Sequence, residues 1–87
     1  METKHFNLFS AKREAETYVE NIYAGTTCAS AVCHIAVDPQ QHCLTIDSVG
    51  KEHEEVIRQQ SACIFTVRYR NRRATVTDTE YINESVM

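Results

Sequence analysis

Residues 63–79 read CIFTVRYRNRRATVTDT, and this stretch decides the fold. Apolar and polar residues alternate along it on either side of Asn71, which is the period of half-buried strands, and Asn tolerates the positive φ of a tight turn. The stretch therefore predicts an antiparallel hairpin with Asn71 and Arg72 at its tip and Arg70 opposite Arg73. Alternation assigns to the apolar face Cys63, Phe65, Val67, Tyr69, Ala74 and Val76. It assigns to the polar face Thr66, Arg68, Arg70, Arg73, Thr75 and Thr77.

A second hairpin is predicted upstream, in residues 29–47, ASAVCHIAVDPQQHCLTID. Asp38 and Pro39 suit the first two positions of a type I turn, and extended runs flank them. We expect Val37 to lie opposite His42. That register assigns to the core face Cys33, Ile35, Val37, His42, Leu44 and Ile46.

One helix is predicted before each hairpin. In SAKREAETYVENIYAG, residues 10–25, Ser10 suits the N-cap and Gly25 suits the position after the helix. Its apolar residues recur at helical spacing, at Ala11, Ala15, Tyr18 and Ile22, and its outer face carries Lys12, Arg13, Glu16 and Glu20. Residues 50–62, GKEHEEVIRQQSA, predict a shorter helix held by Val56 and Ile57.

These elements define an α+β domain in which a mainly antiparallel sheet packs one face against both helices. The order is (β)αββαββ, where the bracketed strand is the short segment KHFNLF at residues 4–9. If that strand forms, βαββαβ is the ferredoxin-like order with one strand added. The 87 residues suit a single compact domain, 1–87, with residues 79–87 as a candidate C-terminal tail.

Composition limits the cellular setting and the kind of site. No stretch is long and apolar enough for an export signal or a membrane span, so we expect a soluble cytoplasmic protein with no membrane association. Its four cysteines are then expected to be reduced thiols. A chain of 87 residues has few apolar side chains for both a core and a deep cavity, which disfavours enclosed catalysis.

Charge is segregated along the chain. The formal charge is −3, yet RYRNRR, residues 68–73, holds four of the nine basic residues. Guanidinium groups pair with phosphates or carboxylates through a planar fork. Like charges that face each other across a hairpin are destabilising unless water or an anion meets them, so the cluster predicts a site for an anionic partner. A solvated hairpin end that discourages edge-to-edge aggregation is the alternative.

Two kinds of anion fit the arginine cluster. An acidic surface on another protein, alone or in a nucleoprotein complex, would meet complementary charge. The partner-binding residues assigned on this basis are Arg68, Arg70, Arg72, Arg73 and, in the C-terminal segment, Tyr81. Nucleic acid is the alternative, but Tyr69 is predicted on the face opposite the arginines, where it cannot stack on bases, and no nucleic-acid-binding motif is found. Pairing of sheet edges into a homodimer stays open.

Metal or thiol chemistry is a third reading. Cys33, His34, His42 and Cys43 are zinc-ligand types within eleven residues. Neighbouring strand residues point to opposite faces, so these four form two half-sites rather than one tetrahedron. His34 on the diagonal of Cys43 would make a Cys-His pair, but nothing in the sequence activates the thiol. We therefore assign no catalytic residue, no metal site and no cofactor.

The sequence thus predicts a small non-enzymatic protein-binding module, a regulator or inhibitor that occludes a surface of its partner. This profile is shared by small inhibitors from phages and mobile elements, which include anti-CRISPR and other anti-defence proteins. The comparison is an analogy, because no sequence motif links this chain to them. The alternative is a nucleic-acid-binding module that sets the hairpin of residues 68–73 against phosphates. The third reading is a zinc or thiol protein.

Overall fold

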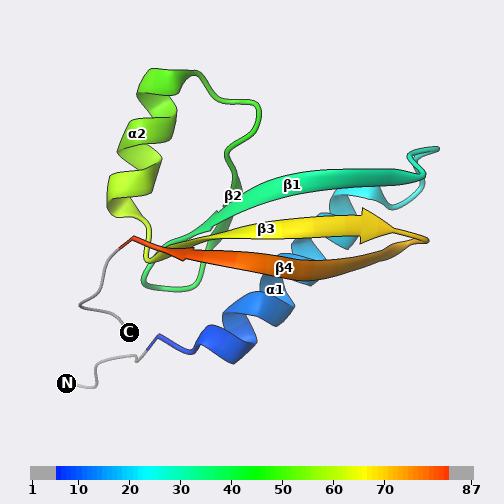
Figure 1. The fold of residues 1–87 in the computed structure, drawn as a ribbon, viewed down its shortest axis with the longest axis horizontal. Coiled ribbons are helices and arrows are strands. Elements are labelled where there is room, and N and C mark those ends of the chain that lie inside the picture. Colours follow the sequence, from blue (N-terminus) through cyan, green and yellow to red (C-terminus); the bar gives the residue numbers. More distant parts are fainter. Residues whose placement is uncertain (1–5, 83–87) are drawn as a thin grey trace.

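A computed structural model describes residues 6–82 and contains two helices and four strands in this range (Figure 1). In chain order the elements are α1 (Leu8–Tyr23), β1 (Ser30–Val37), β2 (Cys43–Thr45), α2 (Lys51–Gln60), β3 (Cys63–Arg70) and β4 (Arg73–Tyr81). The strands form one sheet in the order β2-β1-β3-β4, and every neighbouring pair is antiparallel. The predicted α+β class and the order αββαββ are confirmed.

The β3–β4 hairpin has the predicted turn and register. Asn71 and Arg72 form a two-residue turn with φ of 53° and 64°, the left-handed conformation that a type I′ hairpin turn requires. Arg70 lies opposite Arg73. All six residues predicted for the apolar face belong to the main core or pack against it.

The alternation of β4 breaks at a β-bulge. Thr66 lies opposite Asp78 while the next residue, Val67, lies opposite Val76, so Thr77 is the extra residue. Beyond the bulge the alternation is shifted by one residue. Asp78, and not Thr77 as predicted, therefore lies on the polar face. Sequence alternation alone could not locate this shift.

α1 begins before its predicted N-cap. Asn7, not Ser10, is the N-cap, and its side-chain oxygen accepts the Ser10 backbone N–H at 3.0 Å. Ser10 lies in the first turn, where its hydroxyl accepts a hydrogen bond from the Gln41 side chain at 2.7 Å. The predicted C-terminus is confirmed, because Gly25 follows the C-cap with φ of 77°.

No strand precedes α1 within residues 6–82, because Leu8 and Phe9 belong to the helix. The segment expected as an optional strand therefore supplies the N-cap and the first helical residues, and its residues 4–5 lie outside the described part of the chain. The condition that we set for a ferredoxin-like order is not met between residues 6 and 82.

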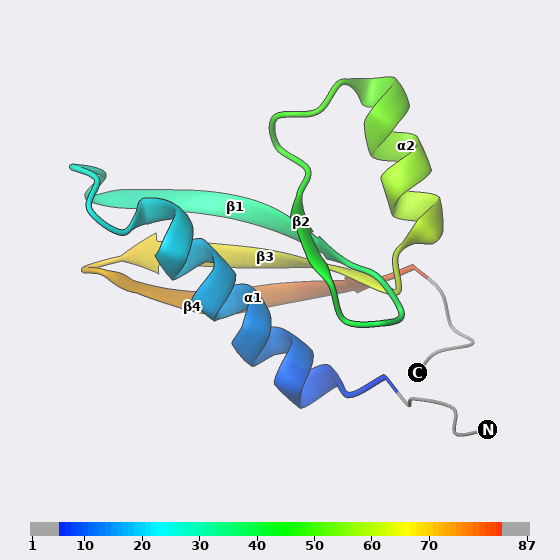
Figure 2. The same ribbon diagram turned by 180° about the vertical axis from the view of Figure 1, so that it is seen from behind.

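The main core lies between α1 and one face of the sheet (Figure 2). α1 contributes Ala11, Ala15 and Val19, which are fully buried. Val19 takes the place predicted for Ile22, which is exposed. The two alanines let the helix approach the strands closely. The largest fully buried side chains are Phe65, Ile35, Val19, Val37, Val67 and Cys63.

α2 packs on the opposite face of the sheet. Its Ile57 joins a second apolar cluster with Ala36 and Ile64, whose positions alternate with those of the main core. The expectation that both helices cover one face is therefore not met, because β1 and β3 offer apolar side chains on both faces at this end. No residue of α2 is buried, and Figures 1 and 2 show the helix at one end of the sheet, away from the β3–β4 turn.

The first hairpin forms one residue out of the predicted register, since Val37 lies opposite Cys43 and not His42. Gln41 adopts φ of 69°, which adds one residue to the turn. The shift turns Cys43 toward the main core and leaves His42 and Leu44, two residues predicted for the core, exposed.

β4 extends to Tyr81, so residues 79–81 of the expected tail are strand, and residues 83–87 lie outside the described part of the chain. Between residues 6 and 82, neither helix has the length and apolar character needed to cross a membrane.

Candidate functional site

Three arginines gather on the outer face, which we define as the sheet face opposite α1. Strand alternation places Arg68 and Arg70 on this face, and the hairpin register places Arg73 beside Arg70. All three are exposed. Together with Thr75 they line an open hollow of about 260 Å³. We call Arg68, Arg70, Arg73 and Thr75 the arginine site.

The guanidinium groups of this site have no carboxylate partner within residues 6–82. The ion pairs in that part of the chain join Arg58 to Glu54 and Glu80, His34 to Asp47, and His42 to Asp38. Because Arg70 and Arg73 lie opposite each other, their like charges repel. This repulsion lowers the free energy of unfolding, and a bound anion would reduce the repulsion.

The structure does not bring the other two predicted contact residues to the arginine site. Arg72, in the turn, lines a separate hollow on the α1 side with Tyr23 and Cys28. Tyr81 lies at the far end of β4, about 27 Å along the strand from Arg73 at the usual rise per residue. It is 46% exposed, but a contact there would belong to a different surface.

Tyr69 has a structural position beneath the arginines. Its ring is buried and stacks on Tyr23 with the ring centroids 4.8 Å apart. The Tyr23 hydroxyl lies 3.3 Å from the Cys33 thiol, and this hydrogen bond, with burial, raises the pKa of Tyr23 to about 12. The stacked pair fixes β3 against α1, and no aromatic ring of β3 or β4 is presented beside the arginines for base stacking.

The outer face carries opposite charges at its two ends. Toward α2 it holds Asp78 and Glu80, and Glu80 accepts two hydrogen bonds from Arg58 at 3.0 and 3.1 Å. Toward the hairpin turn it holds the three guanidinium groups. A flat partner therefore meets positive charge at one end and negative charge at the other.

Val32 places an apolar side chain next to the arginine site. It is 55% exposed and lies opposite Arg68 in the neighbouring strand. Two residues further along β1, the His34 backbone N–H donates to Asp47 at 2.7 Å, and the His34 ring Nδ1 lies 2.7 Å from the other oxygen of that carboxylate. Asp47 thereby holds the chain after β2 against the middle of β1.

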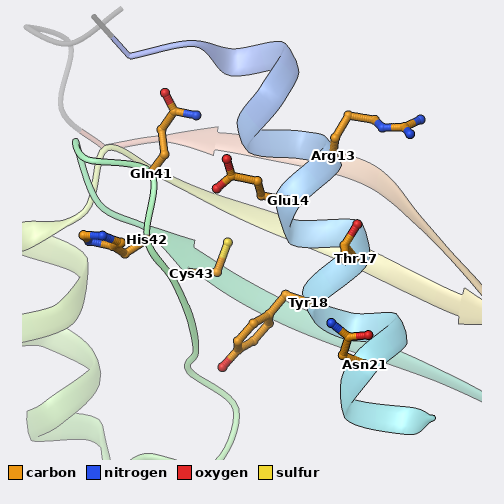
Figure 3. A pocket seen from close by; sticks show the side chains of 8 residues that line it. All are labelled: Arg13, Glu14, Thr17, Tyr18, Asn21, Gln41, His42 and Cys43. Carbon is orange, nitrogen blue, oxygen red and sulfur yellow. The ribbon is translucent and has the colours of Figure 1, made fainter. Parts of the chain in front are cut away.

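A larger groove lies between α1 and the β1–β2 hairpin (Figure 3). Its volume is about 630 Å³, and its lining residues are Arg13, Glu14, Thr17, Tyr18, Asn21, Gln41, His42 and Cys43. Figure 3 shows the Cys43 thiol directed toward α1 and His42 directed away from it. Burial, with the nearby Glu14 and Asp38 carboxylates, raises the pKa of Cys43 to about 11. The thiol therefore stays protonated near neutral pH and is a poor nucleophile.

The predicted proximity of His34 and Cys43 is wrong. Thr45 pairs with Ile35 and not with His34, so Cys43 packs against the main core while His34 lies on the outer face. The four cysteines are free. Within the described residues, no three His, Cys, Asp or Glu side chains are grouped so as to hold a metal ion. This part of the chain therefore offers no site that supports the hypothesis of a zinc or thiol protein.

Sequence analysis missed the role of two glutamates of α1. Glu20 accepts the backbone N–H of Ala74 at 2.9 Å, and Glu16 accepts the backbone N–H of Val76 at 3.0 Å. Both were assigned to a solvated helix face. Side chains four residues apart on a helix are separated by about the same distance as alternate N–H groups of a strand. This spacing predicts such contacts only when β4 is known to be the edge strand beside α1.

Comparison with protein-family models, with curated proteins and with solved structures finds no match to this chain. Its function is therefore inferred from the geometry and charge of the outer face.

Proposed function

We propose that this chain is a non-enzymatic protein-binding module whose outer face attaches to an acidic surface of another protein. One observation carries the proposal: Arg68, Arg70 and Arg73 line one hollow and have no carboxylate partner within residues 6–82. A partner carboxylate would accept paired hydrogen bonds from a guanidinium group and relieve the repulsion between the arginines.

An acidic protein surface suits this face better than nucleic acid does. A nucleic-acid strand carries negative charge along its whole length, and Asp78, which has no ion pair within residues 6–82, would repel it at the α2 end. Single-strand binders also present aromatic rings for stacking, whereas Tyr69 is buried under the sheet. A folded protein can place carboxylates at one end of the contact and basic or neutral groups at the other.

Binding without chemistry suits a regulator or inhibitor that occludes a surface of its partner. We expect this partner in the cytoplasm, where free thiols persist. By analogy with small anti-defence proteins of phages and mobile elements, the protein component of a nucleoprotein complex is a suitable partner.

Affinity capture from an extract of the native host, with and without nuclease treatment, tests the proposal. The test variant is Arg68→Gln/Arg70→Gln/Arg73→Gln, which removes three charges from the arginine site. The control variant is Lys12→Gln/Arg13→Gln/Lys51→Gln, which removes the same charge from the two helices.

We expect the wild type and the control variant to retain one partner protein after nuclease treatment, and the test variant to lose it. Retention that nuclease abolishes for the wild type would assign the arginines to nucleic acid instead. Equal retention by all three forms would contradict the proposal.

A further inference from the structure

The two edges of the sheet differ in how their outward N–H and C=O groups are satisfied. On β4, Glu20 and Glu16 accept the N–H groups of Ala74 and Val76, so carboxylates occupy the sites that an added strand would need. Native sheets commonly protect an edge in this way, because an unpaired edge is a template for another strand. The β4 edge is therefore closed between these two residues.

The β1 edge is covered over only part of its length. β2 pairs with Ile35–Val37, and the next outward-facing residue, His34, donates its N–H to Asp47 and accepts from the Ile46 N–H at 3.1 Å. Outward-facing peptide groups recur at every second residue of an antiparallel strand, so Val32 and Ser30 face outward as well.

No hydrogen bond within residues 6–82 involves the outward N–H or C=O of Val32. The Ser30 C=O accepts only a thiol hydrogen bond from Cys28, at 3.3 Å. In contrast to Ala74 and Val76 of β4, these two residues of β1 present free backbone groups and are themselves exposed. Peptide recognition by strand addition uses edges of this kind.

The side chains beside this edge define what an added strand should carry. Ser30 lies opposite Arg70 and Val32 lies opposite Arg68, so the arginine site begins one strand in from the edge. An added strand would lie about 4.8 Å beyond β1, and every second side chain of it would project on the outer face. Because Ser30 is small, a carboxylate at such a position can face Arg70 across it.

We propose that the β1 edge at residues 30–32 binds an extended acidic segment of the partner protein by strand addition, with a carboxylate of that segment facing Arg70 across Ser30. This inference rests on the proposed function and specifies its binding mode. A second copy of the chain is a poorer occupant, because two-fold pairing of β1 edges would bring two sets of arginines onto one face.

A proline at position 32 tests strand addition selectively. Proline is tolerated on an edge strand where the N–H faces solvent, and Val32→Pro removes one of the two outward donors, those of Ser30 and Val32, that the added strand would use while retaining every arginine. Val32→Thr is the matched control, because it keeps the N–H and the β-branched shape. Circular dichroism and thermal unfolding establish that each variant folds.

The probe is a capped, fluorescein-labelled heptapeptide in which Glu alternates with Thr, and a second peptide has Gln in place of Glu. Fluorescence anisotropy measures binding. We expect the wild type and Val32→Thr to bind the Glu peptide with similar affinity, and Val32→Pro to bind it at least about tenfold more weakly, as loss of a hydrogen bond with its partner left unpaired implies. In NMR exchange experiments the Glu peptide should slow exchange of the Val32 amide proton.

Two results would overturn the inference while leaving the proposed function standing. One is equal binding of the Glu peptide to all three proteins with loss only in the Arg68→Gln/Arg70→Gln/Arg73→Gln variant, which would mean that the arginines act without strand addition. The other is no binding of the Glu peptide to the wild type while that protein still captures its partner in the nuclease-treated extract. Concentration-dependent dimerisation that Val32→Pro abolishes would assign the edge to a second copy and also overturn the inference.

Discussion

Glu20 of α1 accepts the backbone N–H of Ala74 in β4 at 2.9 Å, and this contact joins residues that lie 54 positions apart in the sequence. With the matching contact of Glu16 it fixes the hairpin that carries the arginines against the helix. The guanidinium groups thus lie on a hairpin whose second strand, β4, is held in place by α1.

Removing both glutamates should destabilise the fold. In Glu16→Ala/Glu20→Ala the Ala74 and Val76 N–H groups lose charged acceptors at a part-buried edge, and we expect the free energy of unfolding to fall by about 1–3 kcal/mol. Urea denaturation measures the change. Glu14→Ala, on the same helix and without a hydrogen bond to the sheet, should change stability by less than about 0.5 kcal/mol. An equal effect of both variants would show that the edge contacts are not the cause.

A glycine in the β3–β4 turn should stabilise the protein without affecting the arginine site. Arg72 has φ of 64°, a left-handed conformation that costs an L-residue about 1 kcal/mol and a glycine almost nothing. Arg72→Gly should therefore raise the melting temperature, and Arg72→Ala should not. Because Arg72 lies outside the arginine site, partner capture by Arg72→Gly should equal that of the wild type; loss of capture would place Arg72 in the contact.

Stability should decline at alkaline pH. Burial raises the pKa of both Cys43 and Cys63 to about 11, above the usual thiol value of about 8.5 in an unfolded chain. A raised pKa in the folded state gives stability that is complete below the unfolded pKa and is lost as pH rises through the folded one. The free energy of unfolding should thus fall between about pH 8.5 and pH 11.

Urea titrations at pH 8 and pH 10.5 measure this decline, and the Cys43→Ala/Cys63→Ala variant separates the thiols from other groups that titrate in this range. The double variant is expected to be less stable at pH 8 but to lose less stability on going to pH 10.5. The same loss in both proteins would exclude the thiols as its source.

The β3–β4 hairpin could be predicted from the sequence because strict alternation and a two-residue turn fix its register locally. The first hairpin could not, since the left-handed conformation of Gln41 depends on its turn and on its side-chain hydrogen bond to Ser10. The position of α2 could not be predicted either, because its few apolar residues do not specify which face of the sheet the helix covers.

The arginine site was predictable in part. Strand alternation and the hairpin register placed Arg68, Arg70 and Arg73 on one face, next to one another. It could not show that Tyr81 lies at the far end of β4, nor that Arg72 turns to the α1 side. The open edge at Val32 was also hidden from the sequence, because it arises from the shortness of β2 and from the contact of Asp47 with His34.

The measurement that tests the central claim most directly is the affinity of the captured partner, once purified, for the wild type, the arginine-site variant and the helix-charge control, by calorimetry at two salt concentrations. We predict that Arg68→Gln/Arg70→Gln/Arg73→Gln weakens binding by at least about a hundredfold, as loss of charged hydrogen bonds of about 1.5–3 kcal/mol each implies. The control should bind like the wild type. Wild-type affinity in the arginine-site variant would contradict the proposal that these guanidinium groups bind the partner.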